Sequence, residues 1–244
     1  MFVFSKGRSL GAFAVEEATA SIRRTRLAVV RRKSTNICVT HKWDNGQLTR
    51  EERYPSQLKD SDHKYWLYSL DDLAQYDVPA ALDLIANVTG KAGSIVYMGH
   101  SRDSTVIFMY ASSNPVHARR MLKGIVAFSP IAYFDVVCTQ KYDHGKEKNL
   151  KKYGQAEPPL YNLSNIIVPL VMYYGKHDIM IKESQVQRIN DEIGGAVKVY
   201  KSVPIGVEED KLQYGHNDFI WAGDLDKSLY PHLLESLENY MSSK

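Results

Sequence analysis

After residue 60 the sequence alternates short apolar runs with helical stretches, and this alternation limits the fold more than any other feature. Each apolar run is bounded by glycine, proline or polar residues. Short continuous apolar runs suit strands that are buried on both faces. Strands that alternate with helices predict a mainly parallel sheet with helices on both faces, which is an α/β fold. The predicted strands are 94–98, 124–128, 169–174 and 197–202, and the predicted helices are 69–86 with an interruption at Pro79, 104–113, 183–193 and 227–241.

The residues before position 60 have a different character. Their apolar periodicity is poor, with one candidate strand at 26–30, and basic side chains outnumber acidic ones in the first 33 residues. A basic stretch of this kind is expected to be a solvated arm. We therefore divide the chain into a poorly defined N-terminal segment, 1–59, and a core, 60–244.

Composition narrows the class of protein. A chain of 244 residues is long enough to bury one core, and its net charge of +3 is too small to favour a nucleic-acid partner. Cys38 and Cys138 form neither a disulfide framework nor a metal-ligand pattern. No apolar run approaches the roughly 18–20 residues of a membrane span, and no signal-peptide pattern opens the chain. We therefore expect no cofactor, no metal, no nucleic acid and no transmembrane segment.

The strongest local motif follows the strand predicted at 94–98 and reads Gly99-His100-Ser101-Arg102-Asp103. In a Gly-x-Ser-x-Gly elbow, a sharp turn between strand and helix raises the serine hydroxyl above the sheet. Gly99 supplies the first glycine, but Asp103 occupies the place of the second. Half of this motif, taken alone, favours an ordinary strand-to-helix turn over a nucleophile.

Two later residues strengthen the case for Ser101. A serine nucleophile needs a base, and the base needs an acid that fixes its tautomer. In this kind of sheet the order along the chain is Ser, then Asp or Glu, then His. Asp178 follows the strand predicted at 169–174, and His216 lies between the last strand and the last helix. We predict that Ser101, Asp178 and His216 form a catalytic triad at the carboxyl ends of the strands, with the backbone N–H of Arg102 as an oxyanion donor.

Five segments of the chain form a recognisable series. The first is 65–81, with an aromatic pair, an acidic helix start and Tyr-Asp-Val-Pro-Ala-Ala. The others are the Gly-His-Ser of 99–101, the tract 142–163, the loop 175–178, and the His-Asn-Asp-Phe-Ile-Trp of 216–221. In this order they resemble the acid lipase family, of the lysosomal and gastric lipase type. The resemblance implies an α/β-hydrolase fold, a lipid ester substrate and a secreted or lysosomal relative.

Three features depart from that family. The upstream strands and the His-Gly loop with a second oxyanion donor are not recognisable in 1–59, and losing one such donor typically lowers turnover by about 10²–10³-fold. Asp103 is expected to crowd the elbow and to bring negative charge toward the oxyanion. Only 77 residues separate Ser101 from Asp178, so the helical cap between them is reduced or absent.

These observations leave two main interpretations. The first is a serine ester hydrolase that cleaves lipid or other apolar esters through an acyl-enzyme, a substrate class that allows peripheral contact with lipid surfaces. The alternative is a catalytically impaired or inactive truncated homologue, such as a splice variant or pseudoenzyme, that at most binds apolar ligands. An unrelated α/β binding module would leave the ordered motifs unexplained.

Overall fold

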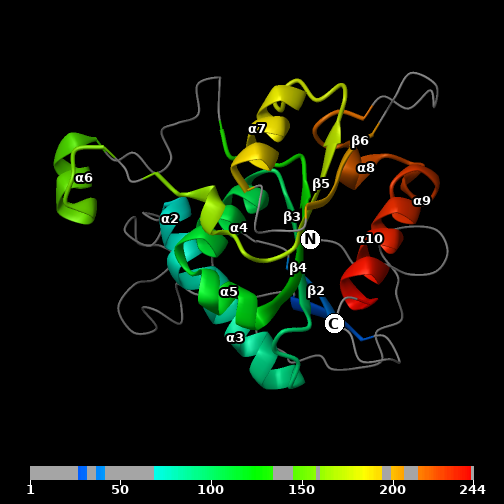
Figure 1. Cartoon of the computed structure of the whole chain (residues 1–244), viewed down its shortest axis with the longest axis horizontal. Coiled ribbons are helices and arrows are strands. Elements are labelled where there is room, and N and C mark those ends of the chain that lie inside the picture. Colours follow the sequence, from blue (N-terminus) through cyan, green and yellow to red (C-terminus); the bar gives the residue numbers. More distant parts are fainter. Residues whose placement is uncertain are drawn as a thin grey trace, which may run out of the picture.

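The computed structural model of the chain describes residues 27–31, 37–41, 69–133, 145–157, 160–193, 199–205 and 214–242, and Figure 1 shows their arrangement. In this part of the chain a sheet with the strand order β1-β2-β3-β4-β5-β6 runs through the centre of the molecule. Neighbouring strands from β2 to β6 are parallel, and β1 alone pairs antiparallel with its neighbour. The predicted α/β class with a mainly parallel sheet is confirmed. The strands are β1 Leu27–Arg31, β2 Ile37–His41, β3 Ile95–His100, β4 Leu122–Phe128, β5 Leu170–Gly175 and β6 Val199–Ile205.

Two strands of the sheet come from the segment before residue 60. β1 matches the candidate strand at 26–30, whereas β2 was not predicted. β2 pairs with β3 through Ile37 opposite Ile95 and Cys38 opposite Val96. As a result, β3 has a strand on each side and lies inside the sheet. The boundary at residue 60 stays a prediction.

Helices cover both faces of the sheet. On one face α3, α4, α5 and α7 pack on buried side chains such as Ile95, Ile125 and Leu170. On the other face α8, α9 and α10 pack on a second apolar cluster that includes Val126 and Val171 (Figure 1). The two clusters take alternate residues of the same strands, as the two-residue period of a strand requires. The helices are α2 Leu70–Asp72, a π-helix Leu73–Asp77, α3 Val78–Thr89, α4 Arg102–Ser113, α5 Pro115–Met121, α6 Lys146–Tyr153, α7 Glu183–Ile193, α8 Asp218–Trp221, α9 Leu225–Ser228 and α10 Tyr230–Ser242.

Candidate active site

The turn between β3 and α4 forms a sharp elbow at Ser101. This serine has φ 55° and ψ −116°, and its N–H donates to the carbonyl oxygen of Phe128 at 2.9 Å. A positive φ is uncommon for a residue other than glycine and is often found at functional sites. The tight contact between strand and helix falls at Gly99, where an added Cβ would lie 3.0 Å from the carbonyl carbon of Asp103. The close approach between strand and helix therefore occurs at Gly99, and crowding by the Asp103 side chain stays a prediction.

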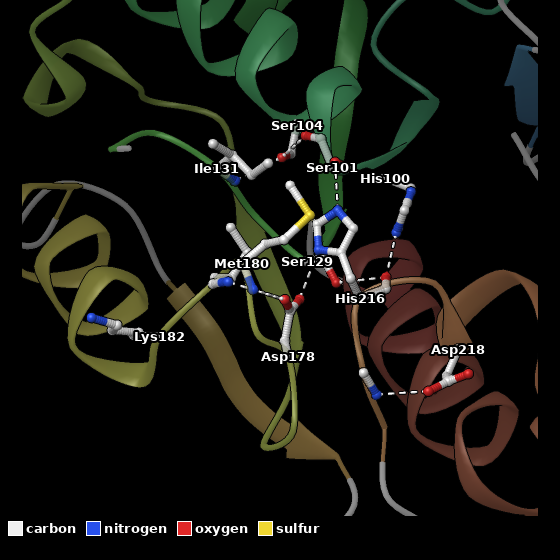
Figure 2. A network of polar contacts seen from close by, with 12 residues as sticks. His100, Ser101, Ser104, Ser129, Ile131, Asp178, Met180, Lys182, His216 and Asp218 are labelled. Carbon is white, nitrogen blue, oxygen red and sulfur yellow. Dashed lines mark hydrogen bonds and ion pairs between the residues drawn. The ribbon is translucent and has the colours of Figure 1, made fainter. Parts of the chain in front are cut away.

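The structure brings Ser101, His216 and Asp178 together, with His216 between the other two (Figure 2). His216 Nε2 lies 2.7 Å from Ser101 Oγ, and Nδ1 lies 2.8 Å from Asp178 Oδ2. Ser101 follows β3 and Asp178 follows β5, so both lie at the carboxyl ends of parallel strands. With the proton on Nδ1, His216 donates to Asp178 and accepts from the Ser101 hydroxyl. This arrangement prepares the imidazole to remove the serine proton.

Asp178 is held as an anion. Its side chain is fully buried, and the side chain of His216 is 11% exposed. Burial raises the pKa of Asp178, but hydrogen bonds from His216 and from the backbone N–H groups of Met180 and Ile181 outweigh burial and bring the pKa below its ordinary value. The carboxylate is therefore charged at neutral pH and can stabilise an imidazolium on His216.

The loop that carries His216 has partners that the sequence did not predict. The carbonyl oxygen of His216 lies 2.7 Å from His100 Nε2 and accepts a hydrogen bond from Ser129 Oγ at 3.1 Å (Figure 2). Ser129 is the second residue other than glycine with a positive φ, 44°, in the described part of the chain. It follows β4 directly, as Ser101 follows β3. A positive φ cannot be read from one sequence, so no sequence signal pointed to Ser129.

The backbone N–H of Arg102 is available for an oxyanion. Arg102 is the first residue of α4, whose N-terminus carries no side-chain cap. Within the described residues this N–H has no protein acceptor. The positive end of a helix favours a developing negative charge. Residues 1–59, in which a second oxyanion donor was not recognisable from the sequence, lie mostly outside the described residues.

Asp103 is a partly exposed carboxyl one residue beyond that N–H. Burial raises its pKa to about 6, and the nearby Arg102 guanidinium opposes part of this effect. A carboxyl whose pKa is higher in the folded state than in the unfolded state destabilises the fold as pH rises from about 4 through about 6. Asp103 is therefore ionised at neutral pH at a cost in stability.

We expect Asp103→Asn to raise the free energy of unfolding near neutral pH by about 1–2 kcal/mol, discounted because the side chain is partly exposed. The gain should vanish near pH 4, because the Asp103 carboxyl of the folded wild-type protein is then protonated and, like asparagine, uncharged. Urea unfolding at both pH values measures it. Asp191→Asn, on the exposed side of α7, is a matched control. Equal gains at both pH values would show that charge is not the cause.

Exposed apolar side chains lie next to the candidate triad. Ile179 and Met180, directly after Asp178, are 94% and 53% exposed. Figure 2 shows the Met180 side chain extending toward Ser101 and His216. In the sequence, β4 and α6 are joined by residues 129–145, and 134–144 lie outside the described residues. Exposed large apolar groups at one site favour contact with an apolar ligand.

Comparison with known proteins finds similarity to lipases, although no family model matches the chain. It is 21% identical to lipase member N of Homo sapiens, over 75% of this chain and 67% of that protein. It is 22% identical to the lysosomal acid lipase/cholesteryl ester hydrolase of Macaca fascicularis, over 75% of this chain and 67% of that protein. The chain is a relative of the acid lipases. A solved esterase from Thermogutta terrifontis is 14% identical at a TM-score of 0.47, over 71% of this chain and 64% of that one.

This acid lipase relative is shorter than the proteins it matches and spans about two thirds of their length. The alignment with human lipase member N runs over 278 positions but contains 75% of this chain, about 183 residues. About 95 aligned positions therefore have no residue in this chain. In the described residues no helix is long and apolar enough to cross a membrane, and no group of three metal-ligating side chains occurs.

Proposed function

We propose that this acid lipase relative is a serine ester hydrolase that cleaves lipid or other apolar esters through an acyl-enzyme. The observation that supports this most is the continuous hydrogen-bonded series from Ser101 through His216 to Asp178, with distances of 2.7 and 2.8 Å. A serine in an ordinary strand-to-helix turn is not expected to combine a strained backbone with a hydrogen bond to a histidine that is paired with a buried carboxylate. The exposed apolar side chains beside Asp178 favour an apolar substrate.

The reaction would proceed in two halves. His216 Nε2 takes the Ser101 proton while Oγ attacks the ester carbonyl carbon, and Asp178 stabilises the imidazolium. The N–H of Arg102 donates to the oxyanion. The tetrahedral intermediate collapses, the alcohol leaves with the proton from His216, and the acyl group stays on Ser101. Water, deprotonated by His216, then attacks the acyl carbon, and the acid leaves as Ser101 recovers its proton.

A fluorophosphonate probe tests this proposal, because it phosphonylates a serine only where a base activates the hydroxyl. We expect intact-mass analysis to show one label on the wild-type chain and peptide mapping to place it on Ser101. Ser101→Ala should stay unlabelled, whereas Ser113→Ala, at the far end of the same helix α4, should label as wild type does. A folded wild-type chain that takes no label would overturn the proposal and support the inactive homologue.

The class of ester needs a second measurement. Relatives are named as a triacylglycerol lipase and a cholesteryl ester hydrolase. With p-nitrophenyl esters of increasing acyl length, we expect kcat/KM to rise with chain length as more apolar surface is buried beside Met180. Met180→Ser should remove part of that rise and leave the shortest ester almost unaffected. A preference for acetate over longer chains would contradict the lipid assignment.

A further inference from the structure

The loop that carries His216 is fixed through three consecutive residues. The carbonyl oxygen of Tyr214 accepts from the N–H of His177 at 3.1 Å, which ties the loop to the end of β5. The N–H of Gly215 donates to Asp218 Oδ2 at 2.7 Å, which ties it to the start of α8. The third anchor is the carbonyl of His216 itself. It is the anchor closest to the imidazole and so controls the ring position most directly.

Two donors converge on that carbonyl from two neighbouring strands. His100, the last residue of β3, reaches it through Nε2, and Ser129, directly after β4, reaches it through Oγ (Figure 2). In the pairing of β3 with β4, His100 lies opposite Phe128, so the two donors leave adjacent strand ends one residue apart. Ser129 is held in this position because its own N–H donates to the carbonyl of Tyr173 in β5 at 2.8 Å.

We propose that His100 and Ser129 are positioning residues, which clamp the His216 carbonyl so that the imidazole stays between Ser101 and Asp178. The inference rests on the proposed function and deepens it. The base sits on a loop, and the hydroxyl that it must reach sits on the elbow. His100 joins the two directly, because it precedes the nucleophile and bonds the backbone of the base. Misplacing a catalytic group by about 1 Å can cost about 10²-fold in rate.

The clamp works without adding charge. A histidine donates to a carbonyl through Nε2 only when that nitrogen carries a proton, and the neutral Nε2–H form satisfies this. Burial lowers the pKa of His100, which favours the neutral ring. The His100 and His216 ring centroids are 5.1 Å apart, so a cation on His100 would oppose the imidazolium that forms during catalysis. A neutral His100 therefore holds the loop without destabilising the imidazolium of His216.

Variants at both donors, compared by two measurements, test the inference. The first is the rate of phosphonylation by a fluorophosphonate together with kcat and KM for a short ester. The second is the low-field proton resonance of His216 Nδ1–H in its bond to Asp178, which needs no turnover. For His100→Ala we expect a rate about tenfold lower with KM unchanged, and for His100→Ala with Ser129→Ala a rate about 100-fold lower. The resonance should shift or broaden in the double variant.

Conservative and non-conservative variants of His100 distinguish a positioning role from a purely structural one. His100→Gln keeps an N–H donor at similar reach and should restore most of the rate and the resonance, whereas His100→Leu should not. His117→Ala is the matched control, because His117 on α5 is also a partly buried, hydrogen-bonded histidine, bound to Tyr110 and Asp83. It should lower thermal stability and leave the rate and the resonance unchanged.

Two results would overturn the inference. One is a His100→Ala rate equal to wild type with an unchanged resonance, and the other is equal loss in the Gln and Leu variants. If the wild-type chain takes no label, the proposed hydrolase function fails. The resonance then decides the clamp by itself, because an unchanged signal in the double variant refutes it and a lost signal supports it.

Discussion

Asp178→Asn is expected to lower kcat about 10⁴-fold while the protein stays folded. An amide at this position can donate to His216 and so stabilises the tautomer with the proton on Nε2, which cannot accept the Ser101 proton. It also provides no charge to stabilise the imidazolium. The fold should survive because the N–H groups of Met180 and Ile181 donate to Oδ1, which an asparagine retains.

Initial rates with a short p-nitrophenyl ester, with circular dichroism as a check on folding, measure this effect. Asp226→Asn, on the exposed side of α9, is the matched control and should keep wild-type activity. Because the folded pKa of Asp178 is depressed, the stability it contributes is present above about pH 4 and lost as pH falls through its folded pKa. The variant should lack that acid-dependent loss. Activity within tenfold of wild type would mean that another group orients His216.

Among the substitutions proposed for this protein, Gly175→Ala is expected to give the largest loss of stability. Gly175 ends β5, and a Cβ there would lie 2.1 Å from the carbonyl oxygen of Tyr214 and 2.7 Å from its carbonyl carbon. Because the obstacle is backbone, no side-chain rotation relieves the clash. Overpacking typically costs about 1–3 kcal/mol, and this contact belongs at the upper end. For a chain of this size the melting temperature should fall by about 6–12 °C.

Activity should fall along with stability, since Tyr214 and His216 belong to one loop and the clash pushes that loop away from Asp178. Scanning calorimetry measures the loss of stability as a lower melting temperature. Esterase rates taken well below the melting temperature of the variant measure the loss of activity separately. Gly223→Ala is the matched control, because nothing lies within 4 Å of a Cβ at that position. A Gly175→Ala protein as stable as wild type would show that the loop moves freely against β5.

Local patterns in the sequence predicted the central strands and the residues at their ends. The apolar runs at 94–98, 124–128 and 169–174 overlap β3, β4 and β5, because a strand buried on both faces leaves no polar position to obscure it. The helix at 183–193 matches α7 at both ends. The three residues proposed as a triad were predicted from the chain order of the motifs, and they are linked by hydrogen bonds through His216 in the structure.

Features that depend on distant residues could not be predicted in this way. β2 is a short run with threonine and histidine, and its pairing with β3 depends on residues far along the chain. The bonds of His216 to His100 and Ser129 span 116 and 87 residues, and no local pattern encodes them. The predicted helix at 227–241 is in fact α9 and α10, separated at Leu229, whose side chain is buried in the core.

The left-handed backbone of Ser101 and Ser129 has a consequence for any attempt to make this protein more robust. Each of these conformations costs a residue with a side chain about 1–3 kcal/mol, and glycine would adopt it almost freely. A laboratory selection for heat resistance alone would therefore favour glycine at both strand ends. The first exchange removes the proposed nucleophile and the second removes a donor to the His216 carbonyl. The most heat-resistant variants would therefore be those that lack the proposed activity.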